Sequence, residues 1–135
     1  APSRATRPGP APEVAYPTGY DAALAEARRL HAAAHLPDAI ALYRAALAVR
    51  ETAAALEGLG RALGEAGDLP AAIEVLRRAI EVDPSSAPSY MALARIYREA
   101  RQLDEARLAY QRYLALEPQG NHADEARAAL AASAR

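Results

Sequence analysis

The chain has 135 residues, a formal net charge of −1 and an apolar content of 52%, much of which is alanine. This length is typical of one domain, and the nearly balanced charge excludes an overall field that would attract nucleic acid or a membrane surface. Cysteine is absent, which excludes disulfide bonds, thiolate metal sites and cysteine nucleophiles.

The N-terminal segment, residues 1–17, contains five prolines among alanine, arginine and glycine. Because proline removes a backbone donor and disfavours helix in the residue before it, we expect a disordered Pro/Ala-rich linker or tail. The segment is either an inert tether or a proline-rich docking ligand, and it contains no PxxP motif flanked by basic residues.

From residue 18 onward the apolar residues recur with a helical period, and turn signals divide the chain into seven expected helices. Thr18 and Thr52 are placed to cap two of them, and Pro88 falls in a first turn, where its missing N–H group is harmless. Gly67 is expected to form a turn, and Asn121 is expected to start the last helix. The expected ranges are about 18–35, 38–50, 53–66, 69–82, 87–100 and 104–117, followed by a final helix of about a dozen residues.

The expected helices form a repeat. Equivalent positions recur at one regular interval in three sets, which are Leu36, Leu69 and Leu103; Ala39, Ala72 and Ala106; and Tyr43, Leu76 and Tyr110. A period of about 34 residues with two helices in each unit is typical of a solenoid.

These units resemble the tetratricopeptide repeat (TPR) family in its bacterial form. Its pattern is a bulky residue, Leu-Gly and an aromatic on the first helix, then Ala, an aromatic and a terminal Pro. Residues 87–120 match it with Tyr90, Leu93, Ala94, Tyr97, Ala106, Tyr110 and Pro118. Residues 53–86 match it with Leu56, Leu59, Gly60, Leu63, Ala72, Leu76 and Pro84. Residues 20–52 match less well, with Ala23, Glu26, Ala27, Leu30, Ala39 and Tyr43, and with Glu51 in place of the proline.

The resemblance implies an all-α fold, a right-handed α-solenoid of three TPR helix-turn-helix repeats plus a C-terminal capping helix. The repeats are expected at about 20–52, 53–86 and 87–120 within residues 18–120, and the cap at 121–135. We expect small residues to let the paired helices approach closely, namely Ala27, Gly60, Ala94, Ala39, Ala72 and Ala106. The last helix carries Ala123, Ala126 and Leu130 on one face and polar or small residues elsewhere, so we expect it to cap an otherwise open end of the stack.

The resemblance also implies that the first helix of each repeat lines a concave groove that binds a segment of a partner protein. The expected partner-binding residues at the groove positions are Arg28, Arg61, Arg95, Arg98, Leu24, Glu57, Met91 and Tyr90. Two interpretations of the arginines stay open. Either they capture an acidic or C-terminal peptide, because arginine suits bidentate contacts with carboxylates, or they are solvated and pair with Glu57, Glu65 and Glu99.

One TPR subclass grips the C-terminal carboxylate of chaperones through a Lys/Asn/Arg clamp. This chain has no Lys, and its single Asn is Asn121 in the expected cap. The resemblance therefore does not carry that clamp over to this chain.

The remaining motifs predict no chemistry. The stretch GLGRALGEAG at 58–67 has the wrong spacing for a phosphate loop. Packing explains Gly60 and the turn explains Gly67, whereas Gly58 and Gly64 leave the hypothesis that they clear space for a ligand backbone. His31 and His35 lack a third ligand nearby and are expected to be turn and surface residues. No catalytic residue, metal site or cofactor is predicted.

The sequence thus predicts a non-catalytic protein–protein interaction module, a TPR scaffold or adaptor that binds a protein or peptide and no nucleic acid. The alternative is a structural subunit or assembly factor of a cell-envelope, secretion or pilus complex, tethered through the N-terminal tail.

No apolar run is long enough to span a bilayer, so no direct membrane insertion is expected. The expected location is cytoplasmic, with a periplasmic or envelope-associated one as the alternative, and the oligomeric state stays open. The first residue is Ala rather than Met, which suggests a processed product or a piece of a longer chain.

Overall fold

The computed structural model describes residues 19–133, so the expected tail at 1–17 and the expected cap at Thr18 lie outside the described residues. Within them the secondary structure is helical, without a strand. The seven helices are α1 Tyr20–Ala32, α2 Leu36–Val49, α3 Ala53–Glu65, α4 Leu69–Val82, α5 Ala87–Glu99, α6 Leu103–Leu116 and α7 Ala123–Ser133. No helix among them combines the length and the apolar character required to cross a membrane.

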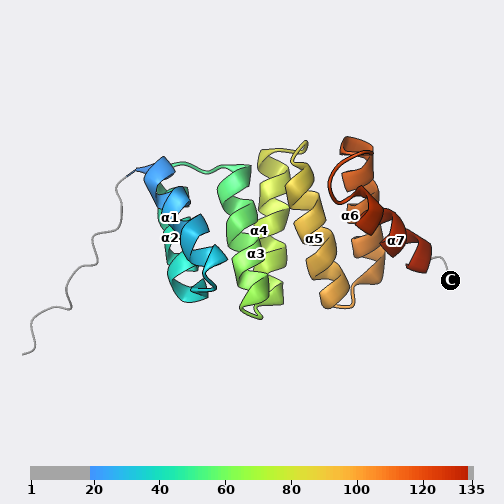
Figure 1. Ribbon diagram of the computed structural model, residues 1–135, viewed down its shortest axis with the longest axis horizontal. Helices are drawn as coiled ribbons and strands as arrows, with labels where there is room; N and C mark the ends of the chain where they lie inside the picture. The colour runs from blue at the N-terminus through green and yellow to red at the C-terminus, as the bar shows by residue number, and fades with distance from the viewer. Residues whose placement is uncertain (1–18, 134–135) are drawn as a thin grey trace, which may run out of the picture.

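The helices stand side by side in a row that follows the chain from α1 at one end to α7 at the other (Figure 1). Each helix packs on the next one along the chain, and the closest pairs are α1 with α2, α3 with α4, and α5 with α6. In addition, α3 contacts α5 directly. This arrangement is the predicted stack of helix pairs, in which neighbouring pairs share one hydrophobic core.

Local sequence signals set the ends of the helices. Thr52 caps α3 as predicted, because its Oγ1 accepts a hydrogen bond of 3.1 Å from the N–H of Ala55. Asp68 caps α4 in the same way, with 3.2 Å between its Oδ1 and the N–H of Ala71. Helix α2 begins at Leu36, slightly earlier than expected, because Pro37 is accommodated in its first turn.

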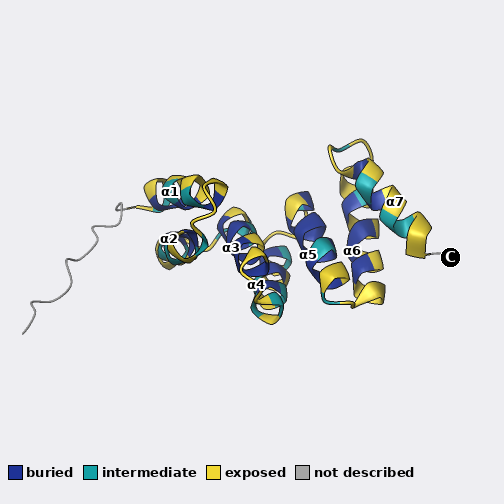
Figure 2. Ribbon diagram, turned by 60° about the horizontal axis from the view of Figure 1, so that its bottom comes forward, coloured by how far each residue is buried: buried dark blue, intermediate teal, exposed yellow. Residues whose placement is uncertain are grey.

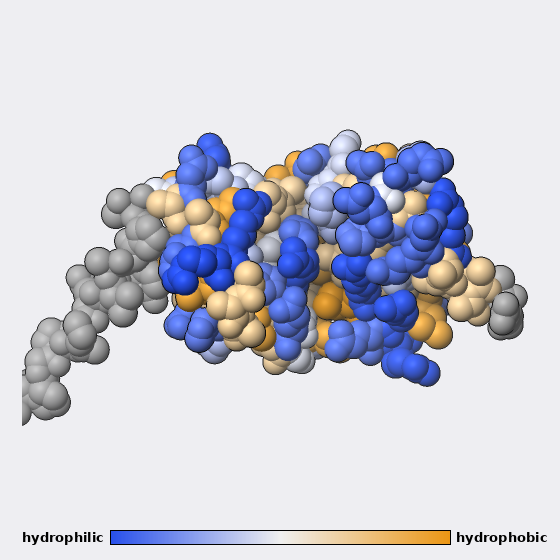
Figure 3. Space-filling model, in the orientation of Figure 1, coloured by the Kyte–Doolittle hydropathy of each residue, from blue (hydrophilic) through white to orange (hydrophobic). Residues whose placement is uncertain are grey.

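The core consists mainly of alanine, leucine and tyrosine from the sides on which the helices meet (Figure 2). The small residues predicted to let paired helices approach are buried, including Ala27, Ala39, Ala72 and Ala94. Because alanine fills so little space, larger side chains such as that of Tyr43 are needed to fill the gaps between helices. Hydrophilic side chains cover most of the outer surface on the face seen in Figure 3, with hydrophobic ones in patches between them.

Helix α3 carries three glycines, and each one lies against a side chain from a different neighbouring helix. A Cβ atom at Gly58, Gly60 or Gly64 would come within 3.0 Å of the side chain it faces. Those side chains are Tyr43 of α2, Leu76 of α4 and Ile96 of α5, in that order. Side chains of the protein itself thus require a glycine at each of these positions. Gly58 also lines a cavity, so the hypothesis that Gly58 and Gly64 clear space for a ligand backbone stays a prediction.

Helix α7 lies where the first helix of a further repeat would be. Its buried residues Ala123 and Ala126 and its partly buried Leu130 stand one repeat length after Ser89, Ala92 and Ile96, which are buried in α5. The face of the last helix that carries Ala123, Ala126 and Leu130 therefore packs against the stack, as expected. The outward positions of α7, among them Asp124 and Arg127, are exposed (Figure 2), as a cap on the end of a stack requires. The helix begins slightly later than Asn121, and residues 117–122 form the loop before it.

Candidate functional site

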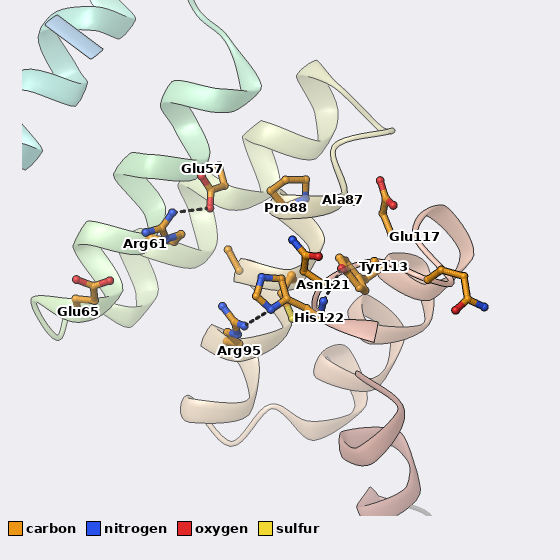
Figure 4. A pocket seen from close by; sticks show the side chains of 14 residues that line it. Glu57, Arg61, Glu65, Ala87, Pro88, Arg95, Tyr113, Glu117, Asn121 and His122 are labelled. Carbon is orange, nitrogen blue, oxygen red and sulfur yellow. Dashed lines mark hydrogen bonds and ion pairs between the residues drawn. The ribbon is translucent and has the colours of Figure 1, made fainter. Parts of the chain in front are cut away.

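Two adjoining cavities lie on the face formed by the first helices of the repeats. The smaller one, of about 360 Å³, lies between α1 and α3. The larger one, of about 870 Å³, is enclosed by α3, α5 and the loop between α6 and α7 (Figure 4). Both cavities are lined by Glu57, Arg61 and Glu65 of α3, so they meet at this helix. We call the two cavities together the groove.

The larger cavity has an apolar floor and a polar rim. Helix α5 supplies Ala87, Met91 and Ala92, all of which are buried. The polar residues come from α3, from the α6–α7 loop and from Arg95 of α5 (Figure 4). Such a combination of apolar surface with a few convergent polar groups is typical of a binding site.

The loop between α6 and α7 is a fixed wall of the larger cavity. The N–H group of His122 donates a hydrogen bond of 3.1 Å to Oη of Tyr113, whose ring is buried. A Cβ atom at Gly120 would lie 2.5 Å from the same Oη, so the backbone passes close to the ring at this glycine. The loop brings Gln119 and Asn121 to the cavity. The sequence indicated only a helix stop at 118–120, because the contact with Tyr113 depends on the path of the chain.

Arg95 forms a bidentate ion pair at the groove. Its Nε and Nη2 donate to the two carboxylate oxygens of Glu125 in α7, each at 2.8 Å, and Nη2 also lies 3.2 Å from Nδ1 of His122. The hydrogen bond from Arg95 lowers the pKa of Glu125, and the same bond raises the pKa of Arg95. Both groups are therefore charged at neutral pH. The sequence does not predict this pair, because its pattern indicates only a cap at α7.

The other predicted arginines differ in how they are paired. Arg61 donates from Nη1 to Oε1 of Glu57, one turn earlier on α3, at 3.3 Å. Arg28 lines the smaller cavity, and within residues 19–133 neither Arg28 nor Arg98 forms an ion pair. Arg98 is exposed and lines neither of the two cavities. If the arginines were solvated, they were expected to pair with Glu57, Glu65 and Glu99. Of these three glutamates, Glu57 pairs with one of the predicted arginines, Arg61.

His31 is buried, so its prediction as a surface residue is wrong. Its Nδ1 lies 3.0 Å from Oη of Tyr43, and its Nε2 lies 2.9 Å from Oε2 of Glu65. The phenol reaches the imidazole because the ring of Tyr43 lies against Gly58, where any side chain would collide with it. The three residues join α1, α2 and α3 beside the smaller cavity, and burial raises the pKa of the Tyr43 hydroxyl.

Of the three apolar residues predicted to bind the partner, one lines the groove and two belong to the hydrophobic core. Met91 is buried and lines the larger cavity. Leu24 and Tyr90 pack in the hydrophobic core and line neither of the two cavities. The described residues contain no cluster of three or more side chains that would suit a metal ion.

Several solved structures share this fold. The TPR2B domain of yeast Sti1, solved as a TPR2B-domain:pHsp70 complex, aligns with a TM-score of 0.80 and 20% identity. The alignment covers 86% of this chain and 98% of that one. The Sgt2 TPR domain from Aspergillus fumigatus aligns with a TM-score of 0.79 and 24% identity, covering 93% of this chain and 80% of that one. The first TPR of Spaghetti (RPAP3), bound to the HSP90 peptide SRMEEVD, aligns with a TM-score of 0.76 and 19% identity, covering 84% and 91%.

The family is established from the sequence itself. No curated protein matches the chain. The family model described as tetratricopeptide repeat matches residues 24–87 and again residues 58–121. The second match is offset from the first by one period of the repeat, and together they span more than half of the chain. The chain therefore belongs to the tetratricopeptide repeat family.

Proposed function

We propose that this chain is a non-catalytic protein-interaction module whose groove binds an extended segment of a partner protein. The observation that carries the proposal is the larger cavity of about 870 Å³, because its apolar floor and polar rim lie along the face formed by the first helices of a TPR stack. A preformed cleft of this kind receives a peptide without first having to rearrange, which lowers the entropic cost of binding.

Two of the structural neighbours support peptide binding as a use of this fold. The Spaghetti domain holds the HSP90 peptide SRMEEVD, and the Sti1 domain was solved in its pHsp70 complex. The Lys/Asn/Arg clamp is not carried over to this chain, which lacks lysine. The groove presents instead arginines on α1 and α3 and side-chain amides on the α6–α7 loop.

The charges of the groove favour a partner segment with few acidic groups. Arg28 forms no ion pair within residues 19–133, and Arg61 keeps donors besides its one hydrogen bond to Glu57, so both can contact a carboxylate. Glu57, Glu65 and Glu117 also line the cavities, and they oppose a strongly acidic ligand. We infer that the partner segment carries an isolated acidic side chain or terminus among uncharged residues, and that its binding weakens as salt is added.

A displayed library of random decapeptides tests this function while the partner is still unidentified. We expect the wild type to enrich peptides that contain Asp or Glu, and Arg61→Glu to lose them. The matched control is Arg77→Glu, which makes the same charge change at an exposed position on α4, outside the groove. The proposal is wrong if Arg61→Glu, with an unchanged thermal melt, enriches the same peptides as the wild type.

The alternative function, as an assembly factor of an envelope complex, involves tethering through residues 1–17. Those residues lie outside the described part of the chain. The proposed binding in the groove does not require them.

A further inference from the structure

Resting on the proposed function, we propose that Glu125 of the cap is a built-in competitor that occupies Arg95 in place of a ligand carboxylate. An acidic group of the partner is then received at the other end of the groove, by Arg28 and Arg61. The end near α5 receives uncharged residues of the same segment.

The geometry of the Arg95–Glu125 pair is that of a bound ligand. Arg95 lines the larger cavity, and its Nε and Nη2 each lie 2.8 Å from one oxygen of the Glu125 carboxylate. This parallel pair of hydrogen bonds is how arginine captures a carboxylate from a partner. His122 also lies 3.2 Å from Nη2. The edge of the guanidinium formed by Nε and Nη2 is therefore already occupied.

The register of the repeat explains why the carboxylate of the cap reaches this arginine. Glu125 stands two repeat lengths after Glu57, at the equivalent position of the helix that replaces a further repeat. Glu57 has Arg61 one turn later on its own helix and pairs with it at 3.3 Å. The position one turn after Glu125 is Ala129, so Glu125 pairs with the arginine of the preceding repeat.

At the opposite end of the groove, no carboxylate holds an arginine through two short hydrogen bonds among the described residues. Arg28 forms no ion pair within residues 19–133, and Arg61 has one long hydrogen bond to Glu57. Both line the smaller cavity. Glu65, which also lines it, is hydrogen-bonded to His31. Arg28 and Arg61 therefore keep N–H donors for a ligand carboxylate, whereas Met91 forms part of an apolar floor at the end near α5.

Fluorescence anisotropy tests the inference with a fluorescein-labelled, C-terminally amidated hexapeptide of glutamine that carries one central glutamate, called the monoglutamate peptide. The all-glutamine hexapeptide is the uncharged control. Removing the competitor in Glu125→Ala exposes Arg95, so we expect this variant to bind the monoglutamate peptide about fivefold more tightly than the wild type does, as suits a partly exposed ion pair. The matched control is Glu117→Ala, which removes a carboxylate that lines the same cavity but forms no ion pair in the described residues. An equal gain in Glu117→Ala would show a general charge effect and overturn the inference.

Substitution of the arginines gives an independent test that leaves α7 unchanged. Because Glu125 already occupies Arg95, we expect Arg95→Gln to change binding of the monoglutamate peptide less than twofold, and Arg61→Gln to weaken it about fivefold. Equal losses in both variants, or no gain of binding in a folded Glu125→Ala protein, overturn the inference. Failure of the proposed function would be seen in a different experiment. There, the peptide library would yield the same peptides for the wild type and for Arg61→Glu, so that binding would not depend on the groove.

Discussion

Two tyrosines at equivalent positions of the repeat differ in one hydrogen bond. The hydroxyl of Tyr43 contacts Nδ1 of His31 at 3.0 Å, whereas the buried hydroxyl of Tyr110 has no partner among the described residues. We expect Tyr43→Phe to lower the free energy of unfolding by about 1–3 kcal/mol, because it leaves a buried imidazole nitrogen unsatisfied. Tyr110→Phe should be neutral or stabilising, because it removes a hydroxyl that is buried without a bond. Urea denaturation of the two variants measures this difference, and equal losses would show that Tyr110 has a partner in solution.

Single residues are also the level at which the sequence predicts least. The expectation of a surface position for His31 fails because its bond to Glu65 joins distant parts of the chain, and only the packing of α1 on α3 brings them together. The position of Arg95 beside the groove could be predicted from the spacing of the arginines. Its partner Glu125 could not, because the pair joins residues 30 positions apart and forms only once α7 has packed at the end of the stack.

At the level of the helices, α3 and α4 approach closely at Gly60. We predict that Gly60→Ala changes the free energy of unfolding in opposite directions with and without the Leu76 side chain. A Cβ atom at Gly60 would lie 2.5 Å from Cγ of Leu76, so Gly60→Ala should cost about 1–3 kcal/mol by overpacking, more than its gain in helix propensity of about 1 kcal/mol. In a Leu76→Ala background, which itself costs about 2–5 kcal/mol, the same mutation should become stabilising. Denaturation midpoints of the four proteins in this cycle measure the coupling. A stabilising effect of Gly60→Ala in both backgrounds would contradict it.

The helices themselves follow closely from the sequence, because their signals are local. The apolar period, the cap at Thr52 and the turn at Gly67, which has φ of 91°, all lie within a few residues of the structure that they determine. The expected start at Asn121 is wrong by a fraction of a turn, since Tyr113 holds the backbone of this loop through a bond to His122. The division of residues 18–120 into three units at about 20–52, 53–86 and 87–120 stays a prediction.

For the whole molecule, the Arg95–Glu125 pair makes the attachment of the cap depend on pH. Arg95 lowers the pKa of Glu125 in the folded protein, so the pair stabilises the fold above the ordinary value of 4.5 and stops doing so as the pH falls through the lowered value. The effect should stay below about 1 kcal/mol, because both side chains are more than a third exposed.

We therefore expect Glu125→Gln to be less stable than the wild type at neutral pH, and the two stabilities to converge in acid. Chemical denaturation at a series of pH values measures the convergence. Asp124→Asn is the control, because Asp124 is fully exposed in the same first turn and pairs only with Arg127 of its own helix, so its removal should not loosen the attachment of α7 to α5. A difference between the wild type and Glu125→Gln that persists in acid would show that the charge of Glu125 is not its cause.

The three glycines of α3 have a consequence for how the protein unfolds. Each costs about 1 kcal/mol of helix stability relative to alanine, so α3 has little tendency to persist alone. Its contacts with Tyr43, Leu76 and Ile96 tie it to helices on both sides. In a linear array, a middle unit with weak intrinsic stability and strong interfaces couples the unfolding of its neighbours. The stack should therefore unfold in one cooperative transition rather than fray from its ends. Because α3 lines both cavities, the binding surface is lost together with the fold and does not persist in a partly unfolded chain.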